Sequence, residues 1–418
     1  MSDVPLPASL RECRDCGQIQ YLPALTPGAV VQCVRCHATL RRTRRDSIGK
    51  ALAFNLTALV LFGIATSATL LSVSSSGQAR VADLFSGPEG LEQNGMWELA
   101  LLVLFATFGA PLVKLLCTTV VLLGLHLPHP PRVLRSAFAW SARLTPWSMI
   151  EVYLLGVFVA CVKLAALVQI EVGTALYALA GLLLVMVAGD FVLDRQVVWE
   201  AMDRRHVPLD DGAVSATAAA VAGKGVVGCH TCGQLSRVPD AAHAHCPRCG
   251  SALHARHPNS INHTWAFLFA ALALYVPANV YPVLNITQLG ASAPSTILGG
   301  VRELIDGGMW PLALLVFVAS VAVPVLKIIC MVLLLVLTQR RSTRRLRDRT
   351  LLYRIVEGVG RWSMIDVFMV SILVALVQFG GLVAINPGAG AIAFAGVVIL
   401  TMFAAGSFDP RLMWDAAA

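Results

Sequence analysis

Eight long apolar stretches limit what this chain can fold into more than any other feature of its sequence. A helix of about 20 apolar residues crosses the roughly 30 Å hydrocarbon core of a bilayer. Only 13% of the residues are charged, whereas a soluble domain carries roughly a quarter. The sequence therefore predicts an all-α polytopic membrane protein. The expected spans are Ile48–Val73, Met96–Leu125, Ser148–Ile170, Thr174–Leu193, Asn262–Leu284, Met309–Leu337, Ser363–Ile385 and Ala389–Phe408.

Lysine and arginine residues are distributed unevenly between the two sides of these spans. Of the 32 Lys and Arg, 27 lie on one side: 26 in the terminal segments or in the segments after the second, fourth and sixth spans, and Lys50 at the start of the first span. Only Arg80 and Arg302 lie in the other loops. Because basic segments stay on the cytoplasmic side, we expect both termini to be cytoplasmic. The run "RRSTRRLRDR" then meets anionic lipid head groups rather than nucleic acid. The polar N-terminus is not expected to be a signal peptide.

The chain repeats itself once, with an offset of 213 to 216 residues. The matching motifs are "NGMWELA" at 94–100 with "GGMWPLA" at 307–313, "APLVKLL" at 110–116 with "VPVLKII" at 323–329, and "PWSMIEV" at 146–152 with "RWSMIDV" at 361–367. Each half has four expected spans, an even number, so both copies have the same orientation and form parallel repeats. We expect two tandem four-helix transmembrane domains.

Each transmembrane domain is expected to follow a small cysteine-bearing module. The predicted parts are a first zinc ribbon at 1–45, a first four-span domain at 46–202, a linker at 203–225, a second zinc ribbon at 226–258, and a second four-span domain at 259–418.

Eight of the eleven cysteines form two sets of paired C-x-x-C. Two such knuckles supply four thiolates in a tetrahedron, which is the zinc-ribbon pattern. Disulfides are disfavoured in a reducing cytoplasm, and a complete shell of four thiolates leaves no open position for catalysis. The sequence predicts two structural zinc ions. The ligands are Cys13, Cys16, Cys33 and Cys36 in the first set, and Cys229, Cys232, Cys246 and Cys249 in the second.

A lysine lies in the middle of an apolar run in each half, at Lys114 and Lys327. Lys327 is about 16 Å from the cytoplasmic end of its helix and Asp366 about 6 Å into the next span, at 1.5 Å per residue. A lysine bends several ångströms toward the interface, so we expect Lys327 to meet Asp366. The first half repeats this pair as Lys114 and Glu151.

Other polar residues occur at the same depth of the second domain. Ser363 lies one turn before Asp366, and Ser320 lies two turns before Lys327 on the same face. Thr401 of the last span is at a comparable depth, where the first half has Met186. We therefore expect a polar cluster in the second domain. Two further charges, Lys163 and Asp190, have no charged equivalent in the second half.

Two interpretations of the buried charges remain open. A buried ion pair can simply fix helix packing. Intramembrane ionisable residues also mark transport routes, which suggests a proton-responsive or gating network. Pro111 and Pro324 lie three residues before the two lysines and can bend their helices.

The chain resembles the paraquat-inducible protein A family, which includes LetA-type intermembrane lipid transport proteins. The resemblance rests on the combination of duplicated C-x-x-C ribbons, four spans after each ribbon, and the motifs "GMW", "P-x-x-K" and "WSM-I-[DE]-V" in both halves. "FDPRLMWD" at the tail adds to the resemblance, which covers nearly the whole chain. It implies a Gram-negative inner-membrane protein that works with a periplasmic MCE-domain tunnel protein to move phospholipid between membranes.

The resemblance also implies that each four-span domain has a tetraspanin- or claudin-like arrangement. It further implies a functional polar network in the second domain, and the matching positions are Lys327, Asp366, Ser363, Ser320 and Thr401. The first half has "SATLLSV" where the second has "YPVLNI" at 281–286, so the two halves are not expected to carry lipid alike.

These observations give three hypotheses for function. The first is a lipid-handling component that loads or unloads the tunnel protein. Since the chain has no G-x-x-x-x-G-K-[ST] motif, the energy would come from an ion or lipid gradient, and protons passing the Lys327–Asp366 network are the simplest coupling. The second is a membrane anchor or scaffold that moves nothing, and the third is an ion-driven exporter of small molecules. No nucleophile–base pair is visible, so an enzyme is not expected.

Overall fold

The structure is a computed structural model of the chain. It describes residues 9–23, 25–75, 78–128, 130–164, 169–205, 226–237, 245–288, 291–377 and 383–415. Most of the expected linker lies outside these residues. Within them, eight helical segments are long and apolar enough to cross a membrane, as predicted. They are Ser47–Ser67, Trp97–Gly124, Val133–Leu164, Thr174–Val192, Ser260–Val280, Trp310–Gln339, Leu346–Leu376 and Ala389–Ser407.

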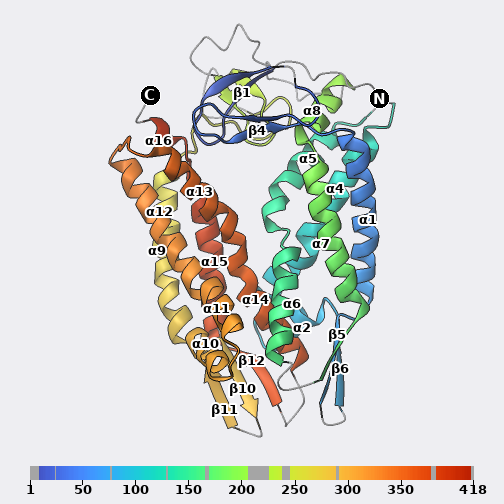
Figure 1. Cartoon of the computed structure of the whole chain (residues 1–418), viewed down its shortest axis with the longest axis vertical. Helices are drawn as coiled ribbons and strands as arrows, with labels where there is room; N and C mark the ends of the chain where they lie inside the picture. Colours follow the sequence, from blue (N-terminus) through green and yellow to red (C-terminus); the bar gives the residue numbers. More distant parts are fainter. Residues whose placement is uncertain are drawn as a thin grey trace.

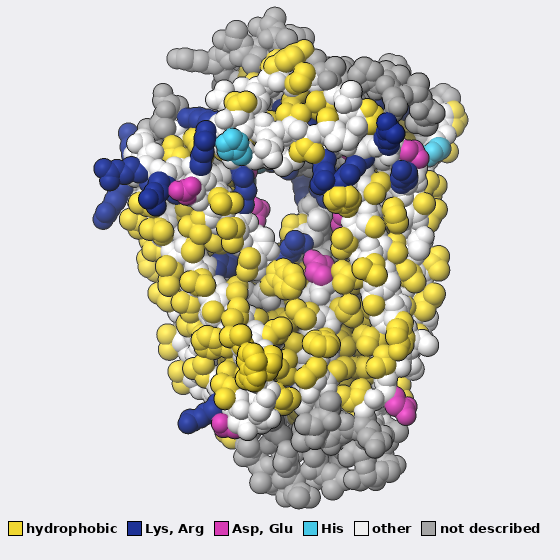
Figure 2. Space-filling model, in the orientation of Figure 1, with side chains coloured by type: hydrophobic (Ala, Val, Ile, Leu, Met, Phe, Trp, Pro, Cys, Tyr) yellow, Lys and Arg dark blue, Asp and Glu magenta, His cyan; other side chains and the backbone are white. Residues whose placement is uncertain are grey.

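The eight segments form two bundles that stand side by side (Figure 1). In the first bundle α1 (Ser47–Ser67) packs along α7 (Thr174–Val192), and in the second α9 (Ser260–Val280) packs along α15 (Ala389–Ser407). Apolar side chains cover much of the outer face of both bundles (Figure 2). This surface is suited to contact with lipid tails rather than with water.

The second and sixth spans each contain one wide π-helical turn. In the second span α3 (Trp97–Leu104) continues through the π turn Phe105–Gly109 into α4 (Ala110–Gly124). The sixth span has the same order, with α11 (Trp310–Phe317), the π turn Val318–Ala322 and α12 (Val323–Gln339). Pro111 and Pro324 are each the second residue after a π turn, and the wider turn accommodates the missing N–H.

The third and seventh spans begin earlier than predicted. α5 (Val133–Leu144) leads through a 3-10 turn at Thr145–Trp147 into α6 (Ile150–Leu164). α13 (Leu346–Val359) leads through Gly360–Met364 into α14 (Ile365–Leu376). The expected starts at Ser148 and Ser363 were wrong because the preceding helices are amphipathic and carry arginines. As a result, Asp366 does not open its span but lies 20 residues after its start.

Two small antiparallel sheets lie at one end of the bundles, here called the sheet end (Figure 1). The strand orders are β6-β5-β7 and β11-β10-β12. The strands are β5 (Leu71–Ser75), β6 (Gln78–Ala82), β7 (Gln169–Val172), β10 (Leu284–Gln288), β11 (Ala291–Ser295) and β12 (Val383–Pro387). The sequence did not predict them, because Val73, Ile170 and Ile385 extend apolar runs that were assigned to spans. Short apolar runs are ambiguous between helix and strand.

A short helix follows the hairpin in each half. These helices are α2 (Ser86–Gln93) and α10 (Ile297–Asp306). Val301 and Leu304 of α10 are buried, whereas Ile305 is 54% exposed. Helix α14 joins the bundles, because α6 and α2 of the first bundle both pack against it.

The opposite end, here called the module end, carries two small cysteine-bearing modules. Module 1 contains β1 (Ser9–Glu12), β2 (Ile19–Leu22), β3 (Val30–Gln32) and β4 (Thr39–Arg42). Module 2 contains β8 (Val226–Gly228), β9 (Leu235–Arg237) and the knuckle at 245–252. Two more helices lie at this end, α8 (Arg195–Arg204) and α16 (Leu412–Asp415).

The knuckle turns of both modules require positive φ. Gly17, Gly233 and Gly250 each follow the second cysteine of a knuckle, with φ of 71°, 73° and 68°. Glycine adopts this conformation without steric cost. In the remaining knuckle His37 takes the same place with φ of 56°.

Candidate functional site

Each module brings four buried cysteine sulfurs together. In both sets all four sulfurs lie within 4.8 Å of one another. The Cys13–Cys36 and Cys16–Cys33 Sγ distances are 3.5 Å, as are those of Cys229–Cys249 and Cys232–Cys246. A tetrahedral ion with metal–sulfur bonds of about 2.3 Å needs sulfurs roughly 3.8 Å apart. The two clusters therefore fit a metal ion, as the cysteine spacing predicted.

The modules dock crosswise on the bundles. Module 1 precedes the first bundle in sequence, yet its cysteines share an apolar core with Met331, Tyr353 and Trp414 of the second half. Module 2 precedes the second bundle, yet its cysteines share a core with Phe138 and Trp199 of the first half.

Some polar contacts follow the same crossed pattern, although Arg41 of module 1 also pairs with Glu200 of the first half at 2.8 Å. Arg354 of α13 pairs with Asp15 of module 1 at 2.6 Å. In the first half, Asp203 pairs with Arg248 of module 2, and Arg143 donates to Ser251 at 3.0 Å. The modules also contact each other, since Gly228 N donates to the Glu12 carboxylate at 2.5 Å. The crossed docking ties the two halves together at the module end.

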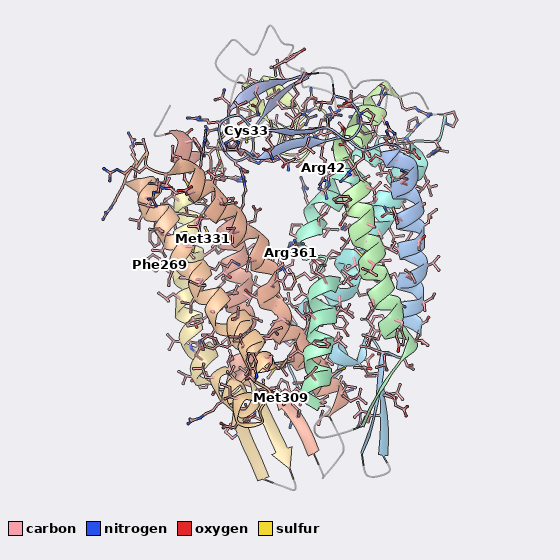
Figure 3. All side chains as sticks on the ribbon, viewed as in Figure 1. Cys33, Arg42, Phe269, Met309, Met331 and Arg361 are labelled. Atoms are coloured by element: carbon pink, nitrogen blue, oxygen red, sulfur yellow. The ribbon has the colours of Figure 1, made fainter. Side chains whose placement is uncertain are left out.

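Below the modules the two bundles diverge. Figure 2 shows an opening through the molecule directly beneath the module layer, with Lys or Arg side chains at its margin. Figure 3 places Arg42 at its module-end margin and Arg361 toward its other margin. Arg361 forms an ion pair at 3.3 Å with Glu151 of the first bundle, so a charged contact between the halves lies at this level.

Lys114 pairs with Asp190 of α7 at 2.6 Å. The expected Lys114–Glu151 pair was wrong, because Glu151 instead faces Arg361 of the other bundle. Asp190 occurs only in the first half, and its counterpart in the second half is Ala405.

Lys327 has no carboxylate partner among the described residues. Its Nζ is buried and makes no hydrogen bond there. It lies against the backbone at Gly360, where an added Cβ would be 2.9 Å from Nζ. The expected ion pair with Asp366 is not formed, because Asp366 lies at the level of Ser320, with which it lines a cavity. Ser320 is seven residues from Lys327, roughly 10 Å along the helix.

Asp366 borders a narrow cavity between the bundles. Its polar lining includes Lys163, Ser320 and Thr296, and most of the remaining lining is apolar. The centres of water-sized molecules can occupy about 50 Å³ of it, which exceeds the roughly 10–15 Å³ that one water needs. The charges of Asp366 and Glu303 act on Lys163, which comes from α6 of the other bundle. The sequence had singled out Lys163 only as a charge without a counterpart.

The remaining predicted network residues are buried in the second bundle. Ser320 Oγ donates to the Val316 carbonyl at 2.6 Å, and Thr401 Oγ1 donates to the Val398 carbonyl at 2.9 Å. Ser363 Oγ is buried without a hydrogen-bond partner among the described residues, as is one oxygen of Asp366. The structure thus brings Ser320 and Asp366 together and leaves Lys327 at a different level.

A buried ion pair anchors the tail motif "FDPRLMWD". Arg411 contacts the Asp409 carboxylate at 3.0 and 2.9 Å, and both side chains are almost fully buried. Burial alone would raise the pKa of Asp409, but the Arg411 contact outweighs it and lowers this pKa. The equivalent Asp194 has Gln196 in place of Arg411, and burial raises the pKa of Asp194.

These features define a duplicated four-span membrane protein with two four-cysteine modules and a buried charged site between its bundles. A model described as "Paraquat-inducible protein A" matches residues 48–203 and 261–418, once in each half. The chain belongs to this family.

The curated relatives match along almost their whole length. The intermembrane transport protein PqiA of Escherichia coli is 33% identical, over 96% of this chain and 95% of that protein. The lipophilic envelope-spanning tunnel protein A of the same species is 31% identical, over 97% and 91%. A probable intermembrane transport protein of Haemophilus influenzae is 25% identical, over 98% and 96%. No solved structure matches the chain. The tetraspanin- or claudin-like arrangement stays a prediction.

Proposed function

We propose that this protein is the inner-membrane component of an intermembrane lipid transport system. It passes phospholipid to or from a periplasmic MCE-domain tunnel protein, with both termini and both modules in the cytoplasm. The relatives' names support transport between membranes. The observation that carries the proposal is the charged site at the contact between two diverging bundles, where Lys163 of one bundle lies near Asp366 of the other.

The buried polar atoms of the second bundle favour a functional site over a purely structural ion pair. Lys327 Nζ, Ser363 Oγ and one Asp366 oxygen are buried without hydrogen-bond partners among the described residues. Each unsatisfied buried polar group costs about 1–3 kcal/mol, and charged ones cost more. Such groups are expected where protonation or a passing ligand satisfies them during the cycle. We therefore place proton coupling at Asp366 and Lys327, with Lys163 as a further member.

The modules are proposed to bind zinc. Four thiolates in a tetrahedron suit Zn²⁺, and a full shell suits a structural ion. In this proposal the two modules hold the two halves together through their crossed docking.

The experiment measures lipid transfer from proteoliposomes that contain this chain to the purified tunnel protein. Asp366→Asn and Lys327→Ala are compared with Arg80→Gln, an exposed change at the sheet end. We expect at least a tenfold slower transfer for Asp366→Asn and a normal rate for Arg80→Gln. A scaffold would instead co-purify with the tunnel protein and lose nothing in either network variant, and that result would refute the transport role.

A further inference from the structure

A second, larger cavity lies at the module end and takes no part in the site described above. Its volume is about 600 Å³, within the range of small-molecule pockets. Both modules, the start of α8 and the ends of the second bundle contribute to it. Arg42, which Figure 3 places at the margin of the opening between the bundles, is one of its lining residues.

The lining is strongly basic. It contains seven arginines and three carboxylates. Glu12 pairs with Arg411 and Asp15 pairs with Arg354, whereas Asp194 caps α8 through one oxygen and its other oxygen has no hydrogen-bond partner among the described residues. The arginines with no carboxylate partner among the described residues are Arg11, Arg14, Arg42 and Arg195.

The four arginines make only neutral contacts in the described structure. Arg11 donates to the Gln196 side chain at 2.6 Å and Arg14 to the Thr231 carbonyl at 3.4 Å. Arg195 donates to Thr145 at 3.0 Å, and Arg42 lies over the Phe191 ring. None of these four contacts brings a carboxylate directly to a guanidinium group.

Two buried guanidinium groups also have unused donors. Arg11 and Arg41 are 8% and 3% exposed, and the Nε of each has no hydrogen-bond partner among the described residues. Arg41 pairs with Glu200, but an anionic ligand in the cavity would satisfy the unused guanidinium donors.

We propose that this cavity binds a phosphate-bearing anion. Guanidinium groups match phosphate oxygens in geometry and charge. The phosphate can belong to a phospholipid head group that enters from the opening or to a soluble phosphate ester. This binding goes beyond the transport proposal and does not depend on the tunnel protein.

The test uses the full chain, purified in neutral detergent and titrated calorimetrically. The probes are dihexanoylphosphatidylglycerol, which is a monomeric anionic lipid, and inorganic phosphate. The variant is Arg14→Gln/Arg195→Gln, because both side chains are exposed to the cavity and lack ion pairs. The control is Arg132→Gln, an exposed arginine at the same end that does not line the cavity.

We expect the wild-type chain and the Arg132→Gln control to bind the lipid equally, and the double variant to bind it at least tenfold more weakly. If inorganic phosphate competes with the lipid, the ligand is the phosphate group itself from any source. If only the lipid binds, the ligand is the head group. Equal binding by the wild type and the double variant, or no binding of either probe, overturns the proposal. Lipid transfer could still occur in that case, so the two proposals fail separately.

Discussion

Lys114 and Lys327 occupy the same position in the two halves, but their surroundings are opposite. Lys114 has a carboxylate at 2.6 Å, supplied by Asp190. Lys327 has Ala405 where Asp190 would be, and its ammonium makes no hydrogen bond among the described residues. The first half satisfies its own buried charge, whereas the second half does not.

The same division appears where the bundles meet. Lys163 of the first half lies at the cavity that Asp366 borders, so the first half supplies a charge to the second. The duplication has therefore produced two different parts. The first bundle pairs its buried lysine internally, and the second bundle holds the unsatisfied buried groups to which we assign the proposed transport cycle.

The largest expected effect concerns the modules. Metal binding provides roughly 10–16 kcal/mol to small zinc modules, so Cys33→Ser or Cys246→Ser is expected to unfold its module. Because docking is crossed, Cys33→Ser should raise hydrogen exchange at the module end of the second bundle, and Cys246→Ser at that of the first. Increased exchange confined to the bundle that follows the mutated module in sequence would contradict the crossed arrangement.

The next largest effect is a difference in stability between substitutions at the equivalent residues Asp409 and Asp194. Asp409→Asn removes one of the two carboxylates that the buried Arg411 contacts and leaves only Glu12, which we expect to cost about 1–3 kcal/mol of unfolding free energy. Asp194→Asn keeps an N-cap side chain and is expected to change stability by less than about 1 kcal/mol. Denaturation of the two variants at neutral pH measures the difference.

The contributions of Asp409 and Asp194 to stability should also depend on pH in opposite ways. The pKa of Asp409 is lowered in the folded state, so its stabilisation is present above the unfolded pKa of about 3.9 and is lost as pH falls through the folded value. The pKa of Asp194 is raised, so its contribution favours folding at low pH and is lost as pH rises through the folded value. The gap between the variants should therefore shrink on acidification, and a constant gap would argue against the assigned pairing.

Substitutions of Lys114 and Lys327 should change the free energy of unfolding with opposite signs. Lys114→Met breaks an ion pair and should destabilise the first bundle, by about 1 kcal/mol because the Asp190 side chain is 45% exposed. Lys327→Met removes an uncompensated buried charge and should stabilise the second bundle by about 1–3 kcal/mol while abolishing transfer. Thermal unfolding of both variants measures the sign, and destabilisation by Lys327→Met would show that this ammonium has a partner in the native state.

The smallest effect concerns the helices α2 and α10. Gly87 and Gly300 are equivalent, but a Cβ at Gly87 would contact Ser371 Oγ closely, whereas one at Gly300 would be 3.9 Å from Lys163 Nζ. Gly87→Ala is therefore expected to cost about 1 kcal/mol through overpacking, and Gly300→Ala less than about 0.5 kcal/mol. Equal costs would mean that α10 packs as tightly as α2 and that the cavity beside it closes.

Several features of the molecule were predictable from the sequence because local rules decide them. Apolar length predicted the eight spans, and paired C-x-x-C motifs predicted the clusters at Cys13 and Cys229. The internal repeat predicted which positions correspond. Span ends were less predictable, because amphipathic helices such as α5 and short strands such as β7 do not differ clearly in hydropathy from their neighbours.

The sequence by itself determined the membrane environment, the number of spans, the two four-cysteine clusters and the presence of costly buried charges, since each depends on residue type and spacing. Only the tertiary structure decided which charges meet. Lys114 pairs with Asp190 rather than Glu151, Asp366 lies near Lys163 of the other half, and each module docks on the bundle it does not precede. The physical reason is that an ion pair or a docking face depends on distances of a few ångströms between segments far apart in the chain, and these are fixed only when the helices pack.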